Sequence, residues 1–246
     1  MTDFFDSPEG RRIAYDLRPG KGPGVMFLHG LHSDMTGTKA TALDAWAAGT
    51  GRGFLRFDCS GHGQSSGVYA ETSIAEWYQD ARSVLLHLAE GPQVLVGSSM
   101  GGWLALLLAR DCPEKVAGLV TIAAAADFTE DGYWASFSPE QQALLMEQGY
   151  LDLHHGGPVP YRVSRKFIVD GRDHFVLRKP LSLPFPTRLL QGSEDRAVPP
   201  DWAVKLFHHA TGPDIRLTLV KGADHNFSAP DNLALIKAAI DEIAPL

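Results

Sequence analysis

The sequence has only two cysteines, no long uninterrupted apolar run and no excess of positive charge. Cys59 and Cys112 have neither metal-ligand nor redox spacing, so we expect both to be buried, reduced thiols. No apolar stretch is long enough to span a bilayer, so stable membrane insertion is not expected. The formal net charge of −7 also argues against nucleic acid as a partner.

Metal-ligand patterns and targeting signals are missing as well. The pairs His154-His155 and His208-His209 have no carboxylate partner at metal-ligand spacing, so the sequence predicts no metal site. No cofactor is expected either. The first six residues are acidic and lack the basic region and apolar run of a secretory signal or transit peptide. We therefore expect a cytoplasmic protein.

The order of predicted elements indicates the fold class. The chain has 246 residues, 44% of them hydrophobic, which is enough for one substantial core. Strand-like and helix-like segments alternate, which predicts an α/β fold with a mostly parallel, doubly wound sheet. The expected strands are 11–17, 25–28, 54–58, 93–96, 116–123, 187–191 and 215–220, and the expected helices are 38–48, 73–89, 102–110, 139–148, 201–209 and 233–243.

Residues 127–184 interrupt this alternation, after the strand predicted at 116–123. We predict that they form a small cap inserted into a core made of residues 1–126 and 185–246. A cap at this point can supply the walls of a pocket and exclude water. Most of its apolar side chains should pack the cap onto the core, and a few should line a pocket; the candidates are Trp134, Phe137, Leu144, Leu145, Met146, Phe167 and Ile168.

The stretch from Tyr161 to Lys179, within the cap, is basic. It contains six Arg or Lys residues and two Asp residues. Two interpretations remain open. The charge could steer an anionic substrate toward the cap, or the run could be an ordinary solvated face.

The most informative motif is Gly97-Ser98-Ser99-Met100-Gly101, which matches G-x-S-x-G. It lies between the strand predicted at 93–96 and the helix predicted at 102–110, which is the context of a nucleophile elbow. Glycines permit so sharp a turn. The positive end of the following helix favours negative charge that develops at the serine. The motif therefore predicts Ser99 as a catalytic nucleophile.

A nucleophilic serine needs a base, and the base needs an orienting acid. In this kind of fold they follow the serine in the order acid, then histidine. Asp195 follows the strand predicted at 187–191, and His225 follows the strand predicted at 215–220. Open α/β sheets bind their ligands at the carboxyl ends of their strands. We therefore predict a triad of Ser99, His225 and Asp195.

Two neighbouring acids, Glu194 and Asp224, are alternatives to Asp195. We favour Asp195 because G-x-x-D spacing after a strand suits the loop that carries the acid. An oxyanion hole is expected beside the triad. Its donors are predicted to be the backbone N–H groups of Met100, which follows the nucleophile, and of Leu31, which follows the strand at 25–28. His29 is expected to shape that loop without transferring protons.

The segment from Arg56 to Ser65 reads as a tight loop at a strand end. Asp58 precedes Ser99 in the chain, so we interpret it as a hydrogen-bond acceptor that stabilises the loop. His62 is expected to be a surface or loop residue.

Together these motifs resemble the α/β-hydrolase family over nearly the whole chain. The branch of palmitoyl-protein thioesterases and acyl-glucuronide esterases is the most similar, on the stretches 56–65 and 91–103. The resemblance implies the same triad of Ser99, Asp195 and His225 and a compact cap. Substrate identity transfers poorly between members of a fold family.

These observations favour a serine hydrolase that cleaves esters or thioesters through an acyl-enzyme on Ser99. Its substrate would be a small-molecule ester or thioester, or an acylated protein. A serine peptidase or a carbon–carbon bond hydrolase with the same triad is an alternative. A noncatalytic ligand-binding protein of this fold is a third, which the complete triad disfavours.

Overall fold

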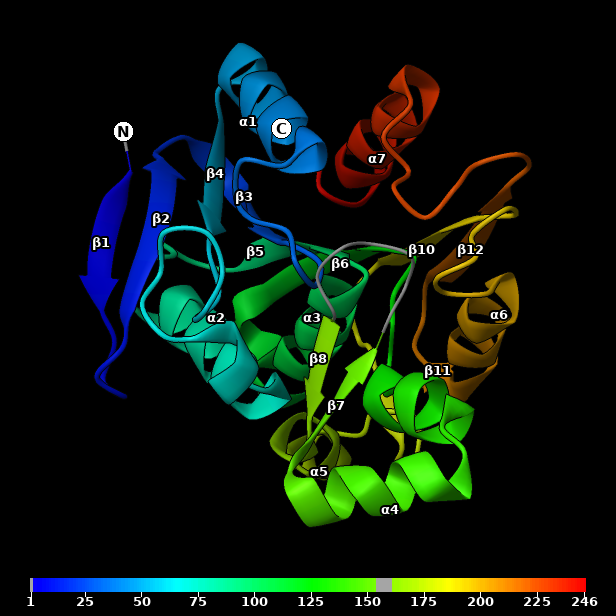
Figure 1. The fold of residues 1–246 in the computed structure, drawn as a ribbon. Coiled ribbons are helices and arrows are strands. Elements are labelled where there is room, and N and C mark those ends of the chain that lie inside the picture. Colours follow the sequence, from blue (N-terminus) through cyan, green and yellow to red (C-terminus); the bar gives the residue numbers. More distant parts are fainter. Residues whose placement is uncertain (1, 154–160) are drawn as a thin grey trace.

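The computed structural model describes residues 2–153 and 161–246, so the pair His154-His155 and the glycines and prolines of 156–160 lie outside it. An eight-stranded sheet runs through the centre, in the order β1-β2-β4-β3-β5-β6-β10-β12 (Figure 1). Neighbours from β4 to β12 pair in parallel, whereas β1–β2 and β2–β4 are antiparallel. The strands are β1 (Asp3–Asp6), β2 (Arg12–Arg18), β3 (Lys21–Leu28), β4 (Arg52–Phe57), β5 (Gln93–Ser98), β6 (Val116–Ile122), β10 (Thr187–Gly192) and β12 (Ile215–Val220).

Helices cover both faces of this sheet, which confirms the predicted α/β class. Val94 and Val96 of β5 pack with α1 (Thr38–Thr50) and α7 (Pro230–Ile243). Leu95, between them, packs on the opposite face. That face is covered by α2 (Ile74–His87), α3 (Met100–Asp111) and α6 (Pro200–His209). The alternation follows from the two-residue period of a strand.

Sequence patterns did not predict the shortest elements. β1 is an exposed, acidic edge strand of four residues. β9 (Leu181–Ser182) and β11 (Ala210–Thr211) form a separate two-residue pairing. Short 3₁₀ turns occur at η1 (Tyr69–Glu71) and η2 (Pro113–Lys115). Segments this short contain too few residues to show a period.

The segment predicted as a cap, residues 127–184, connects β6 to β10 and lies at the lower side of the view in Figure 1. Its helix α4 (Pro139–Gln148) has the predicted bounds, and Ser138 begins it with a capping box to Gln141. The other elements of the segment were not predicted. They are the π-helical η3 (Thr129–Trp134), the hairpin of β7 (Tyr150–Leu153) with β8 (Tyr161–Ser164), and α5 (Arg165–Asp173).

Four of the six cations of the basic run form ion pairs. Their partners come from the segment itself and from the core. The pairs are Arg162 with Asp152 (2.7 Å), Arg172 with Glu130 (2.8 Å), Arg178 with Asp127 (2.5 Å) and Lys166 with Glu76 of α2. These carboxylates neutralise four of the six cations, which leaves little open charge to steer an anion, while the Arg162 and Lys166 side chains stay 47% and 43% exposed, as on a solvated face.

The loop after β4 is held by Asp58, as predicted. Its carboxylate accepts the backbone N–H groups of Met35 (2.7 Å) and Gln64 (2.8 Å). His62 lies in this loop, as one of its two expected placements, but not at the surface, because its side chain is buried, with 5% exposed. The ring packs edge-on against Trp77 and Tyr69, an aromatic environment that sequence spacing did not reveal.

We expect His62 to make the protein acid-sensitive. Burial, followed by the nearby His29, lowers the pKa of His62 from 6.5 to about 4. Between these values the unfolded chain binds a proton that the folded chain does not, so stability falls as the pH drops. The free energy of unfolding that is lost through His62 is about 3 kcal/mol.

Replacing His62 by phenylalanine keeps the ring contacts and should flatten this dependence. Ser60 O still accepts from Trp77 Nε1 in that variant. The measurement is the free energy of unfolding by urea at pH 7, 6, 5 and 4.5 for both proteins. Parallel curves for the wild type and His62→Phe would contradict the assignment.

Candidate active site

Ser99 stands on the turn between β5 and α3. Its backbone lies in the left-handed region, at φ +55°, and its N–H donates to Ile122 O at 2.9 Å. A Cβ at Gly97 would lie 2.3 Å from Gly101 O, and one at Gly101 would lie 2.2 Å from Leu28 O. Only glycine fits at these two positions, which explains the motif and brings the elbow against the end of β3.

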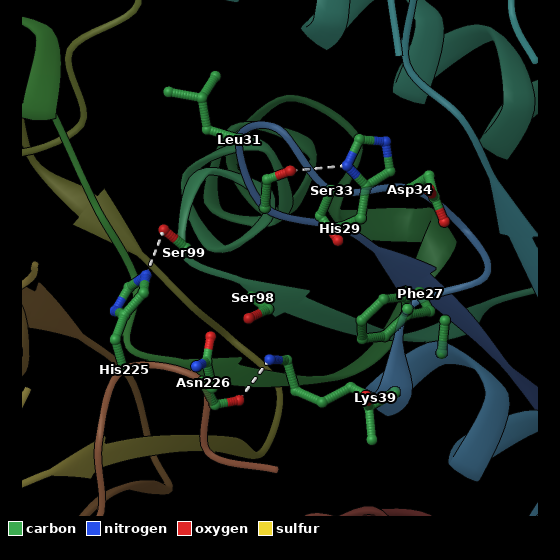
Figure 2. Close-up of a pocket in the computed structure, with 14 residues that line it drawn as sticks. Phe27, His29, Leu31, Ser33, Asp34, Lys39, Ser98, Ser99, His225 and Asn226 are labelled. Carbon is green, nitrogen blue, oxygen red and sulfur yellow. Dashed lines mark hydrogen bonds between the residues drawn. The ribbon is translucent and has the colours of Figure 1, made fainter. Parts of the chain in front are cut away.

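The structure brings together the three residues predicted as a triad. His225 Nε2 lies 3.1 Å from Ser99 Oγ, and His225 Nδ1 lies 2.8 Å from Asp195 Oδ2. Figure 2 shows His225 facing Ser99 across the edge of the sheet. The residues follow β5, β10 and β12, whose carboxyl ends share this edge. The Asp195 side chain is fully buried, while that of His225 is 29% exposed.

Four donors fix the Asp195 carboxylate. Oδ1 accepts from the backbone N–H groups of Ala197 (2.9 Å) and Val198 (2.8 Å), and Oδ2 accepts from His225 and from Gln191 Nε2 (3.0 Å). Burial raises the pKa of Asp195, but these hydrogen bonds outweigh it and leave the pKa below its ordinary value. The carboxylate is therefore charged at neutral pH and oriented toward the imidazole.

The two alternative acids lie outside this arrangement. The Glu194 side chain is exposed, and its backbone N–H donates to Ala223 O at 3.0 Å. Asp224 accepts the N–H of Phe227 and so shapes the loop of His225. Gln191, by contrast, was missed by the sequence analysis. The available sequence signal was a glutamine at the end of an apolar strand, four residues before the acid.

The predicted oxyanion donors lie on the two loops beside Ser99. A Cβ at Gly30 would lie 3.3 Å from Ser99 Cβ, so the loop that carries Leu31 touches the elbow. Among the described residues, neither Leu31 N–H nor Met100 N–H has a protein acceptor. His29 is buried and bridges Gly30 O (2.8 Å) and the N–H of Cys59 (3.1 Å), as its predicted structural role requires.

A large cavity of about 830 Å³ opens over Ser99. Its walls combine apolar side chains from the core and from the segment 127–184. Ser99 and His225 lie at its base, and Asp131 and Arg196 are its charged residues. The apolar lining is Leu31, Ala125, Phe128, Tyr133, Ala197, Val198, Pro199 and Trp202.

The sequence analysis chose the wrong side chains for this cavity. None of the seven apolar candidates lines it, because several are buried between the segment and the core and Leu144 and Met146 face solvent. Arg162, Arg165 and Arg172 do not line it either. Much of the wall comes instead from η3, from the loop before α6 and from Trp202 of α6, and no sequence periodicity relates these segments.

A second, smaller cavity of about 120 Å³ also adjoins Ser99 and His225. Its lining is mostly polar and includes Ser98, Lys39 and Asp34 (Figure 2). Lys39 Nζ donates to Asn226 O at 2.5 Å and so connects α1 to the loop that carries His225. Burial lowers the pKa of Lys39, and the charge of Asp224 opposes this shift.

Within residues 2–153 and 161–246, no group of three or more His, Cys, Asp or Glu side chains is arranged to hold a metal ion. Over the same residues, no helix combines the length and apolar character needed to cross a bilayer.

Comparison with known proteins places the chain in a family. A family model described as serine aminopeptidase, S33, matches residues 23–153. The mitochondrial palmitoyl-protein thioesterase ABHD10 of Mus musculus is 36% identical over 241 residues, which cover 98% of this chain and 81% of that protein.

Two solved structures agree closely with this one. Mouse alpha/beta hydrolase domain-containing protein 10 matches with a TM-score of 0.91 at 35% identity, over 98% of this chain and 97% of that chain. A protein from Agrobacterium vitis S4 matches with a TM-score of 0.91 at 38% identity, over 99% of this chain and 98% of that chain. The resemblance seen in the sequence is thus confirmed, and the chain belongs to the α/β-hydrolase family, as a hydrolytic enzyme of the group that contains the ABHD10 proteins.

Proposed function

We propose that this protein hydrolyses long-chain acyl thioesters or esters through a triad of Ser99, His225 and Asp195. The observation that carries the proposal is the continuous hydrogen-bonded chain of these three residues, which opens onto a largely apolar cavity of about 830 Å³. The name of the mouse relative, a palmitoyl-protein thioesterase, supports the same substrate class.

In the first step His225 Nε2 takes the proton of Ser99 as Oγ attacks the carbonyl carbon of the substrate. Asp195 holds Nδ1 protonated and stabilises the imidazolium that forms. The tetrahedral oxyanion is assigned to the N–H groups of Leu31 and Met100, whose loops meet at Ser99. His225 then protonates the departing oxygen or sulfur, and the acyl group stays on Ser99.

An aminopeptidase, suggested by the name of the family model, is the second candidate. Such an enzyme needs a carboxylate for the substrate's terminal ammonium. Asp131 is the one carboxylate among the described residues that line the large cavity. Arg178 pairs with it, and Lys205 Nζ lies 2.9 Å away. An acid already paired with two cations binds a third one weakly, so the cavity favours acyl substrates.

We propose further that residues 127–184 act as the cap, because Gly132, Tyr133 and Ser136 form part of the cavity wall. The partners would be small-molecule esters or thioesters, or acylated proteins. A cytoplasmic location stays a prediction, since the mouse relative is named as mitochondrial.

The acyl-length profile tests this function. Each methylene that enters the cavity should raise kcat/KM by up to about fourfold, because burying it is worth about 0.8 kcal/mol. Gly132 lies at the wall, and a Cβ there would lie 3.2 Å from the Trp202 ring. Gly132→Leu should therefore shorten the preferred chain by several carbons.

The measurement is kcat/KM over acyl thioesters and p-nitrophenyl esters from two to sixteen carbons. The acetyl ester is the internal control, because it does not reach the wall and should react alike in both proteins. A wild-type profile that peaks at acetyl, or a Gly132→Leu profile that keeps the long-chain preference, would rule out the acyl cavity.

A further inference from the structure

The small polar cavity shares its reactive wall with the large one. Leu31, Ser99 and His225 line both cavities, so an acyl group on Ser99 would have the apolar space on one side and the polar space on the other. A long acyl chain in the large cavity leaves the small one open to water beside His225. At about 120 Å³ it has room for several water molecules.

The lining of the small cavity suits water better than an anion or an acyl chain. Lys39 has three N–H donors, of which one goes to Asn226 O, and the described residues offer the other two no acceptor. Ser98 is 4% exposed, and its hydroxyl makes no hydrogen bond within the described chain. Figure 2 shows both side chains facing the space beside His225.

Charge decides between the possible occupants. Asp34 lines the same cavity as Lys39, so an anion would meet a carboxylate as well as an ammonium. An apolar chain would leave the Lys39 charge without solvation, which is costly. Water molecules can donate hydrogen bonds to Asp34 and accept them from Lys39 and Ser98, so water satisfies both the acceptors and the donors of this cavity.

We propose that this cavity supplies the water that deacylates Ser99, with Ser98 and Lys39 as positioning residues for it. This rests on the proposed function. The water oxygen attacks the acyl carbonyl carbon while His225 Nε2 takes one of its protons. The tetrahedral intermediate then breaks the bond to Ser99 Oγ, which regains the proton from His225, and the fatty acid leaves.

The test compares Ser98→Val with Ser98→Thr. Valine and threonine have nearly the same volume, so the pair separates the loss of the hydroxyl from the added bulk. The acylation rate is measured as the release of p-nitrophenolate from a dodecanoyl ester in the first turnover. The deacylation rate is measured by mass spectrometry of quenched samples, as the acyl-enzyme mass disappears. Ser98→Val should slow deacylation about tenfold and acylation less than about twofold, the effect of one lost hydrogen bond to a positioned water. Ser98→Thr should stay close to the wild type.

Equal slowing of both steps in Ser98→Val, or identical behaviour of the two variants, would overturn the water site while leaving the hydrolase function intact. A wild type that forms no acyl-enzyme would instead remove the function itself. Lys39→Met should also slow deacylation more than acylation, in addition to a loss common to both steps from its broken bond to Asn226 O. If it raises KM only for esters with a carboxylate on the leaving group, the cavity binds the leaving group and the water site is wrong.

Discussion

Replacing Ser99 with alanine should lower kcat by about 10⁴- to 10⁶-fold, because the acyl-enzyme can no longer form. His225→Ala should lose about as much, since Ser99 Oγ has His225 Nε2 as its proton acceptor, at 3.1 Å. The two residues act in one step, so the double variant should be little slower than either single variant. Losses that multiply in the double variant would contradict a shared role.

The controls for this experiment separate chemistry from folding. Ser182 is an exposed serine on β9, far in the chain from the elbow, and Ser182→Ala should keep wild-type activity. A fluorophosphonate probe should label the wild type and Ser182→Ala but not Ser99→Ala. Thermal unfolding of all variants should stay near that of the wild type. Rapid labelling of Ser99→Ala would place the nucleophile elsewhere, and an unlabelled wild type would favour the noncatalytic alternative.

The main strands and helices could be predicted because their patterns are local. β5 and α3 are short apolar runs on either side of a glycine-rich turn, and β12 was predicted with its observed bounds. The proposed triad could be predicted for a related reason. In a parallel sheet, a residue just after a strand lies at the common edge, so chain order and strand ends pointed to Asp195 and His225 as the partners of Ser99.

The features that the sequence did not reveal depend on contacts between distant segments. Lys166 pairs with Glu76 on α2, so its charge could not be judged from the basic run alone. His62 is buried by Trp77 and Tyr69 from other elements. The cavity walls join Tyr133 of η3 to residues near α6, and no periodicity relates those two segments.

Asp195→Asn should lower kcat by about 10⁴-fold through the tautomer of His225. Asp195 Oδ1 accepts two backbone N–H groups, from Ala197 and Val198, so the carbonyl oxygen of an asparagine must take that position. Its NH₂ group then faces His225 Nδ1 and donates to it. The imidazole proton is forced onto Nε2, which can no longer accept the proton of Ser99.

Glu194→Gln is the matched control, because it makes the same chemical change one residue away on an exposed side chain. Its kcat should stay within about twofold of the wild type, as for other surface substitutions. Asp195→Asn should also lose about 1–3 kcal/mol of unfolding free energy. In the wild type Oδ2 accepts a hydrogen bond from Gln191 Nε2, whereas in the variant an NH₂ group would face that same donor and could not accept it. The measurements are kcat, KM and urea unfolding for both variants. A larger loss of kcat in Glu194→Gln than in Asp195→Asn would show that Glu194 is the acid of the triad.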